Sequence, residues 1–220
     1  MVRSFFAVAC GVLVLGSLLE AGGWAVITLM HVPETVVAGE PTRLTYAVRQ
    51  HGRTLLQGLR GRIELRSAGQ VLSAPAHQGV DAGYYTATIV VPRAGTWTMR
   101  IVSGFNARGT EPVTFEALPP GRSAPPLGLV ERGRRLFAAK GCVTCHAHQG
   151  AGGDSLPVGP VLSGRTYQAG AIERLLAPRE GRPDVDGRVE RFTMPDLGLA
   201  PQDVQALAAF LRGDGQVPAP

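Results

Sequence analysis

Apolar and polar residues alternate along most of the first half of the chain, from about residue 24 to residue 116. In an extended strand, every second residue lies on the same face, so each alternating run would present one apolar face to a core. The apolar positions of these runs are Leu44, Tyr46 and Val48; Ile63 and Leu65; Tyr85, Ala87, Ile89 and Val91; and Trp97, Met99 and Ile101. Several short, half-buried strands at this spacing predict a small all-β sandwich. The tetrapeptide at residues 92–95 predicts a hairpin turn between the last two strands.

From residue 127 onward, the apolar spacing changes to that of helices. A first helix would place Leu129, Gly133, Leu136 and Phe137 on one face. A second is expected around Ile172, Leu175 and Leu176, ending before Pro178. A third is expected to begin at Pro201 and to end at Gly213, because proline suits the first helical position and glycine the position after the last. The second half of the chain is therefore expected to be a small all-α domain.

Residues 117–126 separate the two patterns and contain two Pro-Pro pairs. Such a segment cannot continue a sheet or a helix, so we expect a semi-rigid linker. The predicted organisation is a β-sandwich at 24–116, the linker, and an α-domain at 127–220. The prolines also predict an exposed, protease-sensitive connection between domains that share few contacts.

The N-terminal segment, residues 1–23, has the features of an export signal. Arg3 precedes 15 uncharged, mostly apolar residues from Phe5 to Leu19, a length that suits a signal peptide and is short for a bilayer-spanning helix. The sequence at residues 19–21 is a poor cleavage site, so a cleaved signal and a retained membrane anchor both stay open, as does lipid attachment at Cys10. The prediction is export to the periplasm, with or without attachment to the inner membrane.

Composition and charge indicate a globular protein and argue against one class of function, nucleic-acid binding. The chain is 45% hydrophobic and 18% charged, which is typical of a globular protein. Its 22 Lys and Arg residues exceed its 17 Asp and Glu residues, but no run of five like charges occurs. Because binding to phosphates requires clustered cations, nucleic acid is not an expected partner.

The motif with the most specific chemistry is Cys142-Val143-Thr144-Cys145-His146. Two cysteines at this spacing can form thioethers to both vinyl groups of one haem, and the adjacent histidine can then bind the iron. A redox dithiol would be expected within a βαβ pattern, which is missing here. A zinc site would need more ligands, and His148, which we expect at the surface, is the only other Cys or His in this half. The motif therefore predicts one covalent haem c.

Met194 is the candidate for the sixth iron ligand, because it is the only methionine after the motif. A buried core position is the alternative for this side chain, although Met194-Pro195 before a terminal helix favours a ligand. His/Met ligation would leave no iron position for a substrate, and we find no catalytic residues, so an electron carrier is expected rather than an enzyme. The charged, Gly-rich stretch 178–191 is expected to be a solvated loop.

These motifs resemble the class I cytochrome c family over residues 128–213. The resemblance rests on the sequence at 133–137 before the haem motif, 159–162 after it, Met194-Pro195, and the terminal helix at 206–211. It implies that the first and last helices cross at Gly133 against Phe210. It also implies that the carbonyl of Pro160 accepts a hydrogen bond from the imidazole of His146.

The first half resembles the immunoglobulin-like domains of the YtkA/FixH type, on residues 22–26, 49–52 and 94–98. Some of those domains are associated with copper or with the assembly of cytochrome oxidase. Copper ligands could come from Met30, His31, His51, His77 and Met99, since soft sulfur and imidazole ligands suit copper. A docking or spacer role is the alternative that we favour.

Three functions are therefore weighed against each other. The first is a periplasmic carrier that exchanges single electrons with a redox protein or with a membrane respiratory or photosynthetic complex. The second is an integral haem c subunit of a larger membrane oxidoreductase, such as a terminal oxidase or a quinol-oxidising complex. The third is a copper-delivery or assembly factor that acts through the β-domain.

Overall fold

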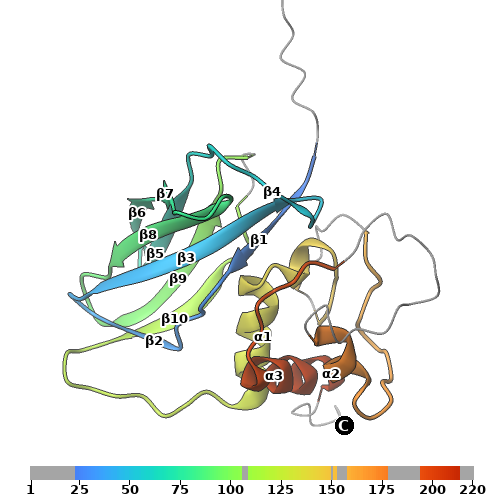
Figure 1. Cartoon of the computed structure of the whole chain (residues 1–220). Coiled ribbons are helices and arrows are strands. Elements are labelled where there is room, and N and C mark those ends of the chain that lie inside the picture. The colour runs from blue at the N-terminus through green and yellow to red at the C-terminus, as the bar shows by residue number, and fades with distance from the viewer. Residues whose placement is uncertain (1–22, 106–108, 150, 153–157, 178–193, 214–220) are drawn as a thin grey trace, which may run out of the picture.

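The computed structural model describes residues 23–105, 109–149, 151–152, 158–177 and 194–213. It contains a β-sandwich followed by a helical region, in the order predicted from the sequence. Figure 1 shows helix α1 between the sandwich on one side and helices α2 and α3 on the other. The predicted signal or anchor segment and the predicted loop at 178–191 lie outside the described residues. Among the residues that the structure describes, no helix is long and apolar enough to cross a membrane.

Two sheets of five strands each form the sandwich. In the first sheet the order is β1 (Ala25–Leu29), β3 (Pro41–Gln50), β8 (Tyr84–Val90) and β7 (His77–Gln78), with β4 (Thr54–Leu55) also paired to β3. In the second sheet the order is β2 (Thr35–Val37), β10 (Val113–Leu118), β9 (Gly95–Val102), β5 (Arg62–Ser67) and β6 (Gln70–Pro75). All strand pairs are antiparallel except β2 with β10. β10 runs to Leu118, two residues beyond the boundary expected from the sequence.

The alternating pattern identified the inward-facing residues correctly. Every apolar position named for the four predicted strands is buried, including Tyr46, Tyr85 and Trp97 at the centre of the sandwich. The predicted hairpin is wrong, however. Strand β8 pairs with β3 and β7, whereas β9 pairs with β10 and β5, so residues 91–94 connect one sheet to the other. The indole of Trp97 donates a hydrogen bond to the carbonyl of Arg93 at 3.1 Å and fixes this crossing.

The helical region contains α1 (Leu129–Ala139), the 3-10 helix η1 (Cys142–Thr144), α2 (Ala171–Leu176) and α3 (Pro201–Arg212). Helix α3 begins and ends where the sequence predicted, with Gly213 in the left-handed region at φ 74°. On α1, Leu136 and Phe137 are buried as expected, but Leu129 is 54% exposed. It lies in the first turn, beyond the contact with α3.

Helices α1 and α3 cross at Gly133. A Cβ atom at this position would lie 2.6 Å from the Cβ of Phe210 and closer still to the carbonyl oxygen of Ala206. Only a residue without a side chain therefore lets the two backbones approach to this distance. The rings of Phe137 and Phe210 pack beside the crossing, with centroids 5.6 Å apart.

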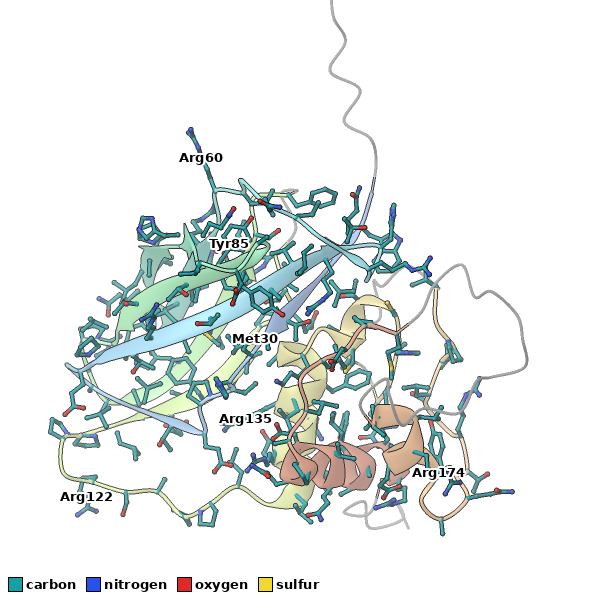
Figure 2. The ribbon with its side chains drawn as sticks, in the orientation of Figure 1. Met30, Arg60, Tyr85, Arg122, Arg135 and Arg174 are labelled. Carbon is teal, nitrogen blue, oxygen red and sulfur yellow. The ribbon has the colours of Figure 1, made fainter. Side chains whose placement is uncertain are left out.

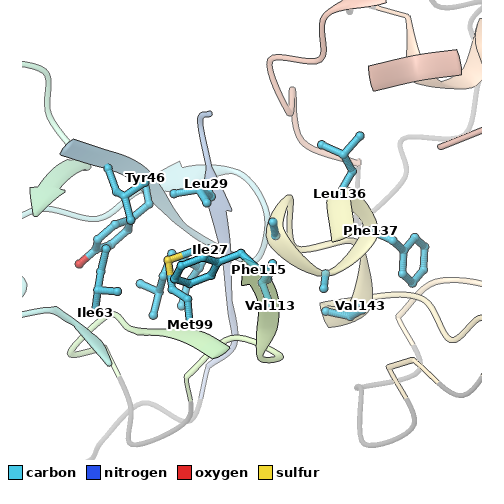
Figure 3. Packing of buried hydrophobic residues seen from close by; sticks show 14 of the residues in the cluster. Ile27, Leu29, Tyr46, Ile63, Met99, Val113, Phe115, Leu136, Phe137 and Val143 are labelled. Atoms are coloured by element: carbon cyan, nitrogen blue, oxygen red, sulfur yellow. The ribbon is translucent and has the colours of Figure 1, made fainter. Parts of the chain in front are cut away.

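The two domains are in contact, which the linker alone did not suggest. The linker itself is exposed, as expected, from Pro119 to Pro126. Across the interface, Arg132 forms ion pairs with Glu34 of the sandwich and with Asp203 of α3, and Arg135 donates to the carbonyl of Glu34 at 3.2 Å. Buried apolar side chains of both domains form one cluster, shown in Figure 3. The expectation of few contacts between the domains is therefore wrong.

Candidate functional site

The two cysteines lie on a single tight turn that follows α1. The helix ends at Ala139 with Lys140 as its C-cap, and Gly141 adopts the left-handed conformation at φ 81°, which reverses the chain. The carbonyl of Cys142 then accepts hydrogen bonds from the backbone N–H groups of Cys145 at 3.1 Å and of His146 at 2.9 Å. Both thiols and the imidazole are thereby held on one short segment, as attachment to a single flat ligand requires.

Both cysteines are free thiols with partly buried side chains. Burial raises the pKa of the Cys142 thiol to about 12 and that of Cys145 to about 11. Burial disfavours the thiolate because its charge loses solvation. In the folded chain, these cysteines are therefore protonated at neutral pH.

His146 is oriented by the segment that follows the motif. Its Nδ1 lies 2.9 Å from the carbonyl oxygen of Pro160, the contact that the family resemblance implies. A carbonyl oxygen can only accept, so Nδ1 carries the proton, and Nε2 keeps its lone pair for a metal. Gly159 leaves space for the ring, because a Cβ there would lie 2.6 Å from Cε1 of His146. This role of Gly159 was not predicted from the sequence, because it depends on the ring of a residue 13 positions earlier.

Met194 lies on the segment that leads into α3. Its side chain is partly buried, and Pro195 and Leu197 are buried beside it. Lys140, at the end of α1, donates to the carbonyl oxygens of Leu197 at 3.3 Å and Gly198 at 3.5 Å. The same ammonium group donates to the carbonyl of Met30 at 2.7 Å, so it also contacts the sandwich. Sequence reasoning missed Lys140, because a lysine at a helix end is ordinarily solvated.

His148 does not lie at the surface, contrary to the sequence-based expectation. It is 3% exposed, and its Nε2 lies 3.2 Å from the carbonyl oxygen of Phe210. Its ring packs edge-on against Phe210, with centroids 4.8 Å apart. A histidine can be buried in this way because the hydrogen bond replaces part of its hydration. His148 therefore supports the α1–α3 contact.

The residues considered for copper are not gathered into a site. Met99 is 2% exposed and lies in the sandwich core, where it is paired with Leu65 and Val113. His31, His51 and His77 are exposed, and the ring of His51 packs against Trp24. Among the described residues, no group of three or more His, Cys, Asp or Glu side chains could hold a metal ion.

Comparison with known protein families accounts for the helical region. Residues 130–213 match the cytochrome c family. This family binds haem c covalently, and Cys142 and Cys145 occupy the C-x-x-C-H position of the domain. The geometry fits such a group, because the thiols share one turn, Nε2 of His146 is available, and Gly159 leaves room beside the ring. The cytochrome c domain thus binds one covalent haem c and has a role in electron transfer.

Beyond this family match, the chain has only weak similarity to known proteins. No curated protein matches it. Salmonella α2-macroglobulin reacted with methylamine is 19% identical with a TM-score of 0.36, covering 47% of this chain and 7% of its own. The surface layer protein SbsC, domains 1–6, is 15% identical with a TM-score of 0.35, covering 47% and 14%. A superoxide reductase from Ignicoccus hospitalis is 16% identical with a TM-score of 0.28, covering 47% and 87%. Similarity of this extent assigns no function to the sandwich, so its YtkA/FixH type stays a prediction.

Proposed function

We propose that this chain is a monohaem c-type cytochrome that carries single electrons outside the cytoplasm, to or from a membrane respiratory or photosynthetic complex. The observation that carries the proposal is the contact between His146 Nδ1 and the Pro160 carbonyl. It fixes the tautomer and the orientation of the imidazole, as the contacts that surround a metal ligand do elsewhere. His146 and Met194 are the residues whose side chains would bind the haem iron.

The bound haem supplies iron that alternates between the ferric and ferrous states, so it accepts or donates one electron at a time. The protein contributes the side chains that would bind the iron and the contacts that orient them. The hydrogen bond to Pro160 increases the basicity of His146, and the thioether sulfur of Met194 favours the ferrous state. If both side chains bound the iron, no coordination position would be left for a substrate, as expected of a carrier.

The location and the partner are proposed from the sequence. The apolar segment from Phe5 to Leu19 supports export, and a retained segment would attach the protein to the membrane. A carrier attached in this way meets a membrane complex at a high local concentration, so weak contacts are sufficient for rapid transfer.

The first test asks whether the haem is covalent and whether Met194 binds it. The exported protein should retain its colour through acid–acetone extraction, and the Cys142→Ser/Cys145→Ser variant should lose it. Met194→His should abolish the weak long-wavelength absorption of the ferric form and lower the reduction potential. Met99→Leu, a change at a core methionine in the sandwich, is the matched control and should preserve both properties. Unchanged spectra and potential in Met194→His would refute the ligand assignment.

The second test concerns the partner. The purified protein should be reduced or oxidised by isolated membranes of its source at a rate that depends on its concentration. Isolation of the native protein distinguishes a carrier, which separates from the membrane complexes, from a permanent subunit, which copurifies with one in a fixed ratio.

A further inference from the structure

Lys140 is a charged residue that haem attachment alone does not explain. It is almost completely buried, with 1% of its surface exposed, at the junction of the two domains. Its ammonium group donates to the carbonyls of Met30, Leu197 and Gly198, and its own backbone carbonyl lies 3.4 Å from the Thr28 hydroxyl, which donates to it. One residue therefore joins the sandwich, the end of α1 and the segment that follows Met194.

Burial of the Lys140 ammonium group costs free energy. An ammonium group loses favourable hydration when it is buried, and burial lowers the pKa of Lys140 accordingly, against the attraction of Asp203, Cys142 and Asp196. Lysine has three donor hydrogens and no acceptor, and three carbonyl oxygens surround it here. The cost of burial is thus offset only while all three chain segments stay together.

Met194 is close in sequence to the carbonyls that Lys140 binds. It precedes Leu197 by three residues. Leu197 is 4% exposed, and the ring of Pro195 fixes one backbone dihedral between the two residues. Gly198 is also in contact with the sandwich, because a Cβ there would lie 3.2 Å from Cε of Met30. A shift of Leu197 would therefore reach Met194 through a short and partly restricted segment of the chain. Figure 2 shows Met30 where the sandwich faces the helical domain.

We propose that Lys140 is a positioning residue through which the β-sandwich holds the Met194 segment in place and so strengthens the bond between Met194 and the haem iron. The inference rests on the axial role proposed above for Met194. It gives the sandwich a function within the haem site, beyond that of a spacer or a docking module.

Lys140→Met in the full-length, haem-loaded protein is the test. Methionine has a similar length and no donor, so it leaves the carbonyls of Leu197, Gly198 and Met30 without the ammonium group. Hydrogen bonds to a charged group are strong enough that their loss should increase the apparent affinity of the ferric haem for added imidazole about tenfold. The long-wavelength absorption should weaken and the reduction potential should fall, since the Met194 bond is weaker.

Arg135→Met is the matched control. Arg135 is a cation on the same helix and at the same interface, but its hydrogen-bond and ion-pair partners are Glu34 and Glu131. This variant should bind imidazole within about twofold of the wild type, because these partners lie on the sandwich and on α1, and not on the segment that carries Met194. Equal imidazole affinity in Lys140→Met and the wild type would overturn the proposal. So would an equal increase in both variants, because the effect would then belong to the interface in general.

Failure of the proposed function gives a different result. In that case the wild type lacks the long-wavelength absorption and Met194→His changes nothing, and both proposals are overturned together. If Lys140→Met yields no haem-loaded protein, nuclear magnetic resonance of the wild type decides. Ammonium protons of Lys140 that exchange slowly with water and lie near Met30 and Gly198 support the proposal, and freely exchanging protons overturn it.

Discussion

The contact between α1 and α3 predicts a large effect for Gly133→Ala. The new methyl group would meet the Ala206 carbonyl oxygen and the Cβ of Phe210, and neither can rotate away. Overpacking of this kind costs about 1–3 kcal/mol, and backbone neighbours place this site near the upper end. Alanine recovers about 1 kcal/mol of helix propensity relative to glycine. We therefore expect a net loss of about 2 kcal/mol in the free energy of unfolding.

Urea denaturation of the haem-loaded protein measures this loss. With an m-value of about 2 kcal/mol per molar urea, the midpoint should fall by about 1 M. Haem absorption follows the cytochrome c domain, and tryptophan fluorescence follows the sandwich, which contains both tryptophans, Trp24 and Trp97. Two probes are needed because a two-domain protein with a bound cofactor need not unfold in one step.

Gly128→Ala, at the N-cap of the same helix, is the matched control. Gly128 precedes α1 at φ −60°, and nothing lies within 4 Å of a Cβ placed there, so alanine should change the stability by no more than about 0.5 kcal/mol. If Gly133→Ala proves as stable as Gly128→Ala, the close crossing of the helices is wrong, and with it the packing that supports the haem turn.

Two further predictions concern the thiols and the linker. In the haem-free folded chain, iodoacetamide at pH 8 should alkylate Cys142 and Cys145 at least about tenfold more slowly than in the urea-unfolded chain. The reason is that their pKa values are raised and the thiolate is the reacting form. Equal alkylation rates in the two states, measured by mass spectrometry, would contradict the burial of these thiols. A trypsin-type protease should cut the linker after the exposed Arg122. The two fragments should remain associated on size-exclusion chromatography, because Arg132 and Lys140 join the domains. Separation of an intact coloured fragment would show that these contacts are weak.

The residues that face inward could be predicted from the sequence, but the partners of some strands could not. A period of two identifies the buried face of a strand because alternate side chains point the same way. It carries no information on which strand lies alongside. The segment at 92–95 therefore suggested a hairpin, whereas β8 and β9 belong to different sheets. Helix α3 was predictable at both ends because proline and glycine have local backbone preferences.

In the candidate site too, some residues could be predicted from the sequence and others could not. Cys142, Cys145 and His146 were identifiable because their spacing is local and their chemistry specific. The roles of Lys140 and His148 depend on residues far along the chain, namely Met30 and Phe210, so no local pattern could reveal them. The linker composition likewise predicted an exposed connection correctly, but it describes the linker alone and not how the domains pack.

Strand β1 lies at the edge of its sheet, and the cytochrome c domain is packed beside it. A Cβ on Gly141 would lie 2.6 Å from the carbonyl oxygen of Ile27, so the turn before the haem motif closely approaches the backbone of this strand. Exposed edge strands offer unpaired hydrogen-bonding groups to other chains and promote aggregation. A sandwich produced without the haem-binding domain would therefore present the backbone of β1 on an uncovered edge, where another chain could pair with it.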